Sequence, residues 1–202
     1  MGRRVKLGIK NLFSNNYLLY LFVLLFLVMG IIFGVIGVKT LTDQQLAFLG
    51  NYIDLGLNNI EKIESQTVAK YAIWRNLETI LKIWFLGLTV IGLPLILVII
   101  FTRGFVLGFT VGFILENKAW QGLGLVLISI LPQNIFHLPA LVLAGVAAIS
   151  FCFYLLNSRK RELQPLFHCF LKYSLIMILL AVVMIFAGLI EGYISPLVKN
   201  LI

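Results

Sequence analysis

The chain has 202 residues, of which 61% are hydrophobic and 12% are charged, and its mean hydropathy is +1.04. This composition excludes a soluble globular domain, because too little polar side-chain surface is available to coat one of this length. The formal net charge is +8, but Lys and Arg lie at the ends of apolar blocks, which favours membrane orientation over nucleic-acid binding. We therefore expect an integral membrane protein that contacts the lipid bilayer and binds no nucleic acid.

The amino-terminal residues 1–16 contain Arg3, Arg4, Lys6 and Lys10 among apolar side chains, which predicts a cytoplasmic, interfacial segment on an anionic leaflet. The first apolar block is residues 17–38, and its 22 residues exceed the ~7–15 of a signal-peptide core. Bulky residues also follow the block where a cleavage site needs small ones. The block is therefore predicted to remain as the first transmembrane helix.

Residues 39–80 are predicted to form a helical extracytoplasmic loop. Thr42 and Gln45 have the spacing of a capping box. Apolar residues then follow at intervals of three and four, which predicts an amphipathic helix: Leu46, Leu49, Ile53, Leu57 and Ile60. Val68, Ala72 and Trp74 indicate a second helix that leads into the next crossing. These helices are expected to cover the bundle, lie on the outer leaflet or offer a groove to another protein.

The remaining apolar blocks predict a second crossing at 81–101, a third region at 104–131, a fourth crossing at 135–156 and a fifth at 171–190. A polar stretch at 116–121 divides the third region into pieces that extend only about 18 Å and 15 Å as helices. Neither piece spans the ~30 Å hydrocarbon layer comfortably. We therefore expect this region to be broken or re-entrant, with its break at Asn117 or Pro132.

The predicted fold is all-α: a single membrane domain, residues 1–202, formed by a polytopic bundle of about five transmembrane helices. Its orientation follows from charge. Basic residues precede the first and last crossings, Arg103 lies between the second and third, and residues 39–82 balance five basic with five acidic side chains. The positive-inside rule then predicts a cytoplasmic amino terminus and an extracytoplasmic tail at 191–202.

Small residues recur four positions apart in four regions, which places them on one helical face and lets backbones approach closely. The residues are Gly30 and Gly34; Gly104, Gly108 and Gly112; Ala140, Ala144 and Ala148; Gly188 and Gly192. Contacts between helices of one chain are the favoured interpretation. A homodimer is the alternative.

Polar residues near the predicted membrane interior are Glu116, Lys118, Gln133, Asn134 and His137. Such groups mark functional sites by default, although a break at the outer surface would leave them in water. Gln133 and Asn134 are expected to tie the third region to its neighbours through hydrogen bonds of about 0.6–2 kcal/mol each.

Signatures of catalysis are missing from the sequence. His137 and His168 have no HExxH partner, and no GxSxG or phosphate-cradling loop occurs. Cys152 and Cys169 are interpreted as small apolar fillers at membrane depth. We expect no enzyme and no catalytic, cofactor-binding or metal-binding residues.

Three segments, Tyr20–Gly34, Arg103–Phe109 and Ile130–Asn134 (Ile-Leu-Pro-Gln-Asn), resemble the stage II sporulation protein M family, and the likeness extends over essentially the whole chain. The resemblance implies a membrane protein of the mother-cell septal and engulfing membrane. It also implies a non-catalytic scaffold that acts with stage II sporulation proteins P and D, which degrade peptidoglycan during forespore engulfment. Residues expected to carry the architecture are Arg103, Gly104, Gly108, Pro132, Gln133 and Asn134.

Two other functions are compatible with the sequence. A small-solute or ion transporter or channel would place its site at the interrupted third region, because short broken segments also build substrate sites. It would require a polar path and an inverted repeat, and no convincing repeat is present. A membrane enzyme would use Glu116 or His137, with a second titratable group within hydrogen-bond reach.

Overall fold

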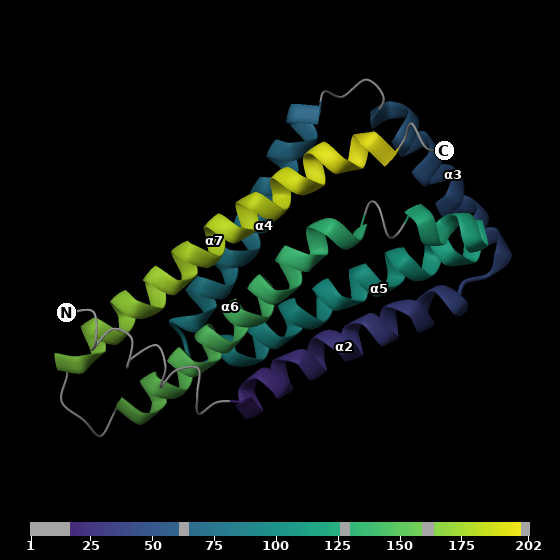
Figure 1. Ribbon diagram of the computed structural model, residues 1–202. Helices are drawn as coiled ribbons and strands as arrows, with labels where there is room; N and C mark the ends of the chain where they lie inside the picture. Colours follow the sequence, from purple (N-terminus) through teal and green to yellow (C-terminus); the bar gives the residue numbers. More distant parts are fainter. Residues whose placement is uncertain (1–16, 61–64, 126–129, 159–163, 199–202) are drawn as a thin grey trace.

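The computed structural model describes residues 17–60, 65–125, 130–158 and 164–198, and this part of the chain is helical and contains no strand. Its helices are α2 (Tyr17–Lys39), α3 (Asp43–Ile60), α4 (Ser65–Gly87), α5 (Gly92–Leu125), α6 (Leu131–Ser158) and α7 (Gln164–Val198). They form an elongated bundle (Figure 1). The predicted all-α class is thereby confirmed, whereas the basic segment 1–16 and the last residues, 199–202, lie outside the described residues.

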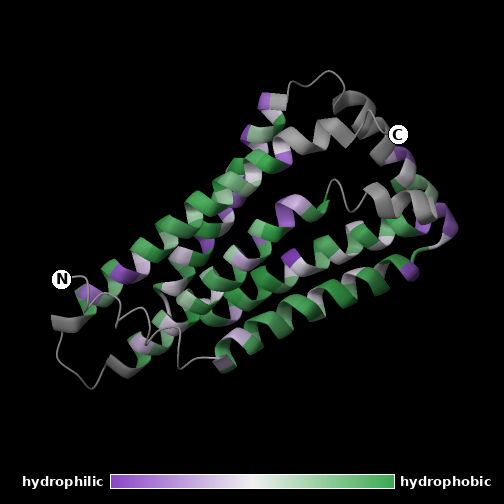
Figure 2. Ribbon diagram, viewed as in Figure 1, coloured by the Kyte–Doolittle hydropathy of each residue, from purple (hydrophilic) through white to green (hydrophobic). Residues whose placement is uncertain are grey.

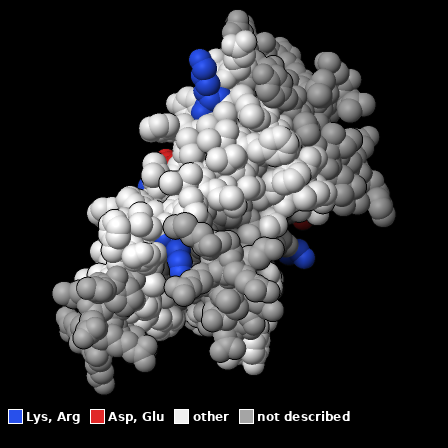
Figure 3. All heavy atoms as spheres, turned by 60° about the vertical axis from the view of Figure 1, so that its left-hand side comes forward, with Lys and Arg blue, Asp and Glu red and all other residues white. Residues whose placement is uncertain are grey.

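Four of the described helices are long and apolar enough to cross a membrane: Tyr17–Lys39, Gly92–Glu116, Leu131–Leu156 and Leu166–Gly192. Figure 2 shows α2 coloured as hydrophobic over most of its length. Among the described residues in the view of Figure 3, most of the surface is uncharged, with scattered Lys, Arg, Asp and Glu side chains. The chain is therefore a multi-pass membrane protein. Five spans were predicted. Helix α4 is not among the helices that are both long and apolar enough to cross a membrane.

The predicted second crossing, 81–101, is wrong as a single helix, because α4 ends at Gly87 and α5 begins at Gly92. A tight turn joins them, with the amides of Leu88 and Gly92 donating to the carbonyls of Phe85 and Thr89 at 3.1 Å each. A Cβ atom at position 92 would overlap the Leu86 carbonyl, so the turn requires glycine there. Hydropathy does not reveal this turn, because three of its four residues, Leu88, Val90 and Ile91, are apolar.

The break predicted at Asn117 is also wrong, since α5 continues through the polar stretch to Leu125. The other predicted break, at Pro132, is the beginning of a helix: α6 starts at Leu131. Proline is tolerated in the first turn because its missing N–H would have no intrahelical partner. The described residues of the third region, 104–125 and 130–131, therefore show no re-entrant segment, and residues 126–129 lie outside them.

Helices α2 and α5 run parallel in close contact, and glycines on both sides make the contact possible. A Cβ atom on Gly34 would overlap the carbonyl of Phe105, and one on Gly108 would overlap that of Ile31. Gly30 and Gly104 meet the opposite backbone in the same way. These two glycine series thus pack against one another within the chain, as expected for small residues in a membrane helix pair.

Helices α4 and α7 form a second close pair, which is antiparallel. Gly188 lies against the backbone of Ile73 and Gly192 against that of Ala69, while the Tyr173 hydroxyl donates to the Trp84 carbonyl at 3.0 Å. Residues 69–84 of α4 therefore run beside residues 173–192 of α7, which belong to an apolar span. Helix α4 therefore lies alongside that span over this stretch.

Helix α6 lies between the two pairs and is the most buried of the four spans (Figure 1). Ala140, Ala144 and Ala148 are all buried on it. Phe151 stacks on Tyr173 with ring centroids 4.6 Å apart. The buried Cys152 places its Sγ 3.3 Å from the carbonyls of Gly87 and Thr89, so it contacts the α4–α5 turn.

The helical content predicted for 39–80 is confirmed in its described residues, which form α3 and the amino-terminal two-thirds of α4. The expected capping interaction is made, because the amide of Thr42 donates to Gln45 Oε1 at 3.0 Å. Ala72 is buried whereas Trp74 is exposed. The second helix thus exists, but one of its predicted apolar residues faces outward.

Candidate functional site: a polar cavity between the helices

The sequence predicted Arg103 in a cytoplasmic turn between two crossings. In the structure it lies inside the α5 span instead. It follows the first residue of the span, Gly92, by eleven positions, which is roughly 17 Å along a helix. Its side chain is therefore near the middle of the apolar helix. A charged group at this depth is costly unless it is hydrogen-bonded or faces a polar cavity.

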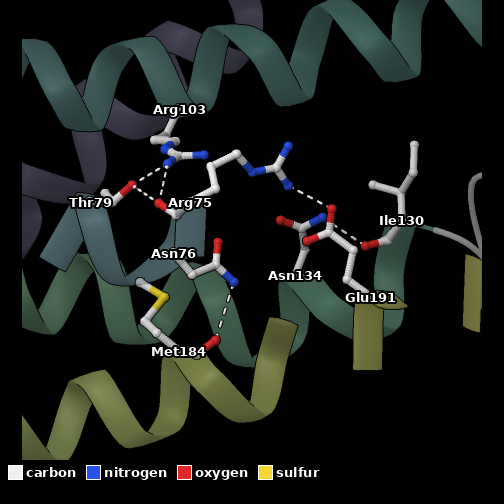
Figure 4. A network of polar contacts seen from close by, with 8 residues as sticks. All are labelled: Arg75, Asn76, Thr79, Arg103, Ile130, Asn134, Met184 and Glu191. Atoms are coloured by element: carbon white, nitrogen blue, oxygen red, sulfur yellow. Dashed lines mark hydrogen bonds and ion pairs between the residues drawn. The ribbon is translucent and has the colours of Figure 1, made fainter. Parts of the chain in front are cut away.

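Two oxygens of α4 accept hydrogen bonds from this guanidinium (Figure 4). Arg103 Nη2 donates to Thr79 Oγ1 and, at 3.3 Å, to the carbonyl of Arg75. The Thr79 hydroxyl donates to the same carbonyl at 2.9 Å. Both acceptors are neutral, so the charge of Arg103 is solvated by the protein but is not neutralised by these contacts.

A second set of contacts joins α4 to α7. Arg75 Nη2 lies 2.6 Å from Glu191 Oε1, and the two side chains are 54% and 19% exposed. The buried amide of Asn76 donates to the Met184 carbonyl at 3.2 Å (Figure 4). These contacts fix one face of α4 to α7, in addition to the glycine contacts described above.

The polar groups surround a cavity of about 240 Å³ between α4, α5, α6 and α7. Helix α6 contributes Gln133, Asn134 and the buried His137. Asn134 Nδ2 donates to the Ile130 carbonyl at 2.7 Å, within its own helix end, and Gln133 Oε1 is buried with no hydrogen-bond donor among the described residues. Among the described residues, neither Asn134 Nδ2 nor Gln133 Oε1 therefore makes the predicted hydrogen bond to a neighbouring helix.

Other residues predicted to be important lie elsewhere. Glu116 is exposed and does not line the cavity, and the side chain of Lys118 lies outside the described residues. Pro132 is in the first turn of α6. The glycines are at the α2–α5 contact, where Gly112 approaches Val38 and Val35.

Sequence reasoning missed the cavity residues contributed by the other helices: Arg75, Asn76, Thr110 and Glu191. Thr79, which binds Arg103, was missed as well. The available signal was weak. Glu191 directly follows an apolar block, and Arg75 and Asn76 belong to a segment interpreted as a loop.

The electrostatics of the site favour binding of negative charge. Two guanidinium groups and one carboxylate line the cavity, which gives 2 − 1 = +1 apart from His137. In the part of the chain that the structure describes, no three His, Cys, Asp or Glu side chains come together as a metal site would require. The arrangement is suited to holding helices together and to binding an anion.

Comparison with known families identifies a family whose model matches most of the chain. The family model described as "Stage II sporulation protein M" matches residues 23–196 of the chain, which covers every described apolar span in whole or large part. No curated protein matches. No solved structure matches either.

Proposed function

Because the chain belongs to the stage II sporulation protein M family, we propose that it is a non-catalytic membrane scaffold that recruits peptidoglycan-degrading proteins during forespore engulfment. Family membership by itself suggests a sporulation-related membrane protein. The scaffold role is proposed from the resemblance to that family. The resemblance also implies stage II sporulation proteins P and D as partners and the mother-cell septal and engulfing membrane as the location.

One observation carries the proposal: α4 lies at the depth of an apolar span but presents charged side chains outward. Glu78 and Lys82 form an ion pair of 2.7 Å, and their side chains are 49% and 60% exposed. By the α4–α7 register, in which Asn76 meets Met184 and Trp84 meets Tyr173, this pair is level with the middle of α7. Ions exposed to hydrocarbon are unfavourable. The outward face of α4 is therefore suited to contact another membrane protein.

We propose further that α4 is the second of five crossings, in place of the wrongly predicted 81–101. Its antiparallel contacts with α7 support this topology, since they extend from Ala69 to Trp84. Five crossings with basic residues 1–16 in the cytoplasm leave the carboxy terminus outside. The α3 helix would then lie on the outer side, where wall-degrading proteins act.

The polar cavity supports the same function structurally. The hydrogen bonds from Arg103 to α4 and the Arg75–Glu191 ion pair hold a comparatively polar helix against the apolar bundle. Polar contacts of this kind specify one arrangement of membrane helices where burial of apolar surface supplies little drive. A fixed α4 would present a constant face to its partner.

Site-specific photo-crosslinking in sporulating cells tests the proposal. Cross-linkable residues would replace the exposed Tyr71 and Trp74 on α4 and, as matched controls, the similarly exposed Leu175 and Leu179 on α7. Capture of a wall-degrading protein from α4 positions alone is the expected result. Capture of lipid alone from both helices contradicts the proposal, and capture of a second copy of the chain would indicate that the α4 face forms a homodimer instead.

The cavity also favours a second candidate function, a transporter of small anions. Its polar lining lies beside the mid-span Arg103, and substrate sites of transporters lie near the bilayer midplane. Reconstituted protein that moves no anion across vesicles, while the cross-link to a wall-degrading protein persists, would eliminate this candidate.

A further inference from the structure

We propose that the cavity beside Arg103 binds a glycerophosphate group: an anionic phosphate ester that carries free hydroxyls. The group could be the headgroup of a membrane lipid or a soluble glycerol phosphate, since both offer the same chemistry. This inference does not rest on the scaffold function.

The first argument is charge. Glu191 is paired with Arg75 at 2.6 Å, whereas the acceptors that Arg103 binds among the described residues are the neutral oxygens of Thr79 and Arg75. Glu191 and Glu78 act on Arg103 only from beyond ion-pair distance. No carboxylate of the described residues forms an ion pair with Arg103. A guanidinium at this depth forms its strongest hydrogen bonds with an acceptor that is itself charged. Phosphate oxygens are spaced to accept two parallel N–H bonds from a guanidinium.

The second argument is the unpaired acceptor. Gln133 Oε1 is buried and has no donor among the described residues, although it lines the same cavity as Arg103. A buried acceptor without a hydrogen bond costs free energy. A fully ionised phosphate ester offers no donor for it, but a hydroxyl on the alcohol part of the ester does. The charge of Arg103 and the unpaired oxygen of Gln133 together favour an anion that also carries hydroxyl donors.

The third argument is position. Ile130 directly precedes α6, and Glu191 is one residue before the end of the α7 span, so both lie near the ends of membrane helices. Arg103, by contrast, is near the middle of its span. The cavity therefore extends from the level of the lipid headgroups inward, which suits a polar headgroup entering from that side.

The test measures lipids that stay bound to the purified full-length protein by native mass spectrometry. The probes are phosphatidylglycerol and phosphatidylethanol, which have the same phosphodiester charge but differ in headgroup hydroxyls. The wild type is expected to retain phosphatidylglycerol preferentially. R103Q should lower its retention about tenfold, the loss expected for a charge-assisted hydrogen bond.

Two further variants keep the proposal falsifiable. K39Q removes one cation at the end of α2, outside the cavity, and is expected to retain the lipid as the wild type does. Q133L removes the unpaired acceptor, so it should fold even if R103Q does not, and it should abolish the preference for phosphatidylglycerol over phosphatidylethanol. Equal losses in R103Q and K39Q, or an unchanged preference in Q133L, would overturn the proposal.

Soluble sn-glycerol 3-phosphate distinguishes the two sources. If it competes with the lipid in the wild type and not in R103Q, the site accepts the free ester as well. If it fails to compete while R103Q still loses phosphatidylglycerol, the ligand is the lipid headgroup. Loss of cross-links to wall-degrading proteins leaves either result intact.

Discussion

Arg75 and Glu191 are separated by 116 positions in the sequence, yet their side chains lie 2.6 Å apart and join α4 to the end of the α7 span. The carboxylate is the more buried partner, with 19% of its side chain exposed against 54% for the arginine. Loss of the arginine therefore leaves a partly buried carboxylate without its counter-ion. The relationship is open to a direct energetic test.

The Arg75–Glu191 pair is expected to show a coupling free energy of about 1 kcal/mol, near the upper end for ion pairs with partial exposure. The single variants R75Q and E191Q should each lower the free energy of unfolding, and the double variant should lower it by less than their sum. Reversible unfolding in mixed micelles measures this. The exposed Glu78–Lys82 pair is the matched control and should show a smaller coupling; additive effects at Arg75 and Glu191 would contradict the assigned contact.

Two glycines of α2, Gly34 and Gly37, should differ in their tolerance of substitution by alanine. A Cβ atom on Gly34 would overlap the Phe105 backbone, whereas one on Gly37 would meet the Phe105 ring at 3.6 Å, an ordinary contact. G34A is therefore expected to destabilise the protein by about 1–3 kcal/mol, as overpacking does. G37A should change stability by less than about 0.5 kcal/mol. Equal thermal stabilities of the two purified variants would contradict the close α2–α5 contact.

Gly87 and Tyr173 should be coupled. A Cβ atom on Gly87 would overlap the Tyr173 hydroxyl, which donates to the carbonyl of Trp84. Y173F alone should cost about 1 kcal/mol, the net value of a typical hydrogen bond. Added to G87A, the same change should restore part of the lost stability because the overlapping oxygen is gone. Independent, additive losses in thermal unfolding would count against this arrangement.

The proposed topology predicts opposite locations for the two chain ends. Alkaline phosphatase fused after Ile202 should be active, because it folds outside the cytoplasm, whereas a fluorescent protein at the same position should stay dark. The fluorescent protein fused before Met1 is the control and should be bright. A bright carboxy-terminal fusion would indicate an even number of crossings and would remove α4 from the set.

The sequence by itself determined the class of the protein and most of its helices. Four apolar blocks recur as parts of α2, α5, α6 and α7, because about 20 consecutive apolar residues have few alternatives to a membrane helix. The cap at Thr42 and Gln45 was predictable too, since it depends only on residues three apart. The close approach of glycines was foreseen as a tendency, without the partners.

Tertiary structure decided which helix lies beside which, where α4 ends and what surrounds Arg103. Hydropathy cannot detect the turn at 88–91, because three of its four residues are apolar, like most of the residues on either side. Gly87, Gly92 and Pro94 were the available signals. Hydropathy also cannot assign Arg103 to a cavity, because the groups that solvate it belong to another helix; Thr79, for example, is 24 positions earlier in the sequence. A charge is tolerated at membrane depth only through such distant partners, and their positions exist only after the helices have assembled.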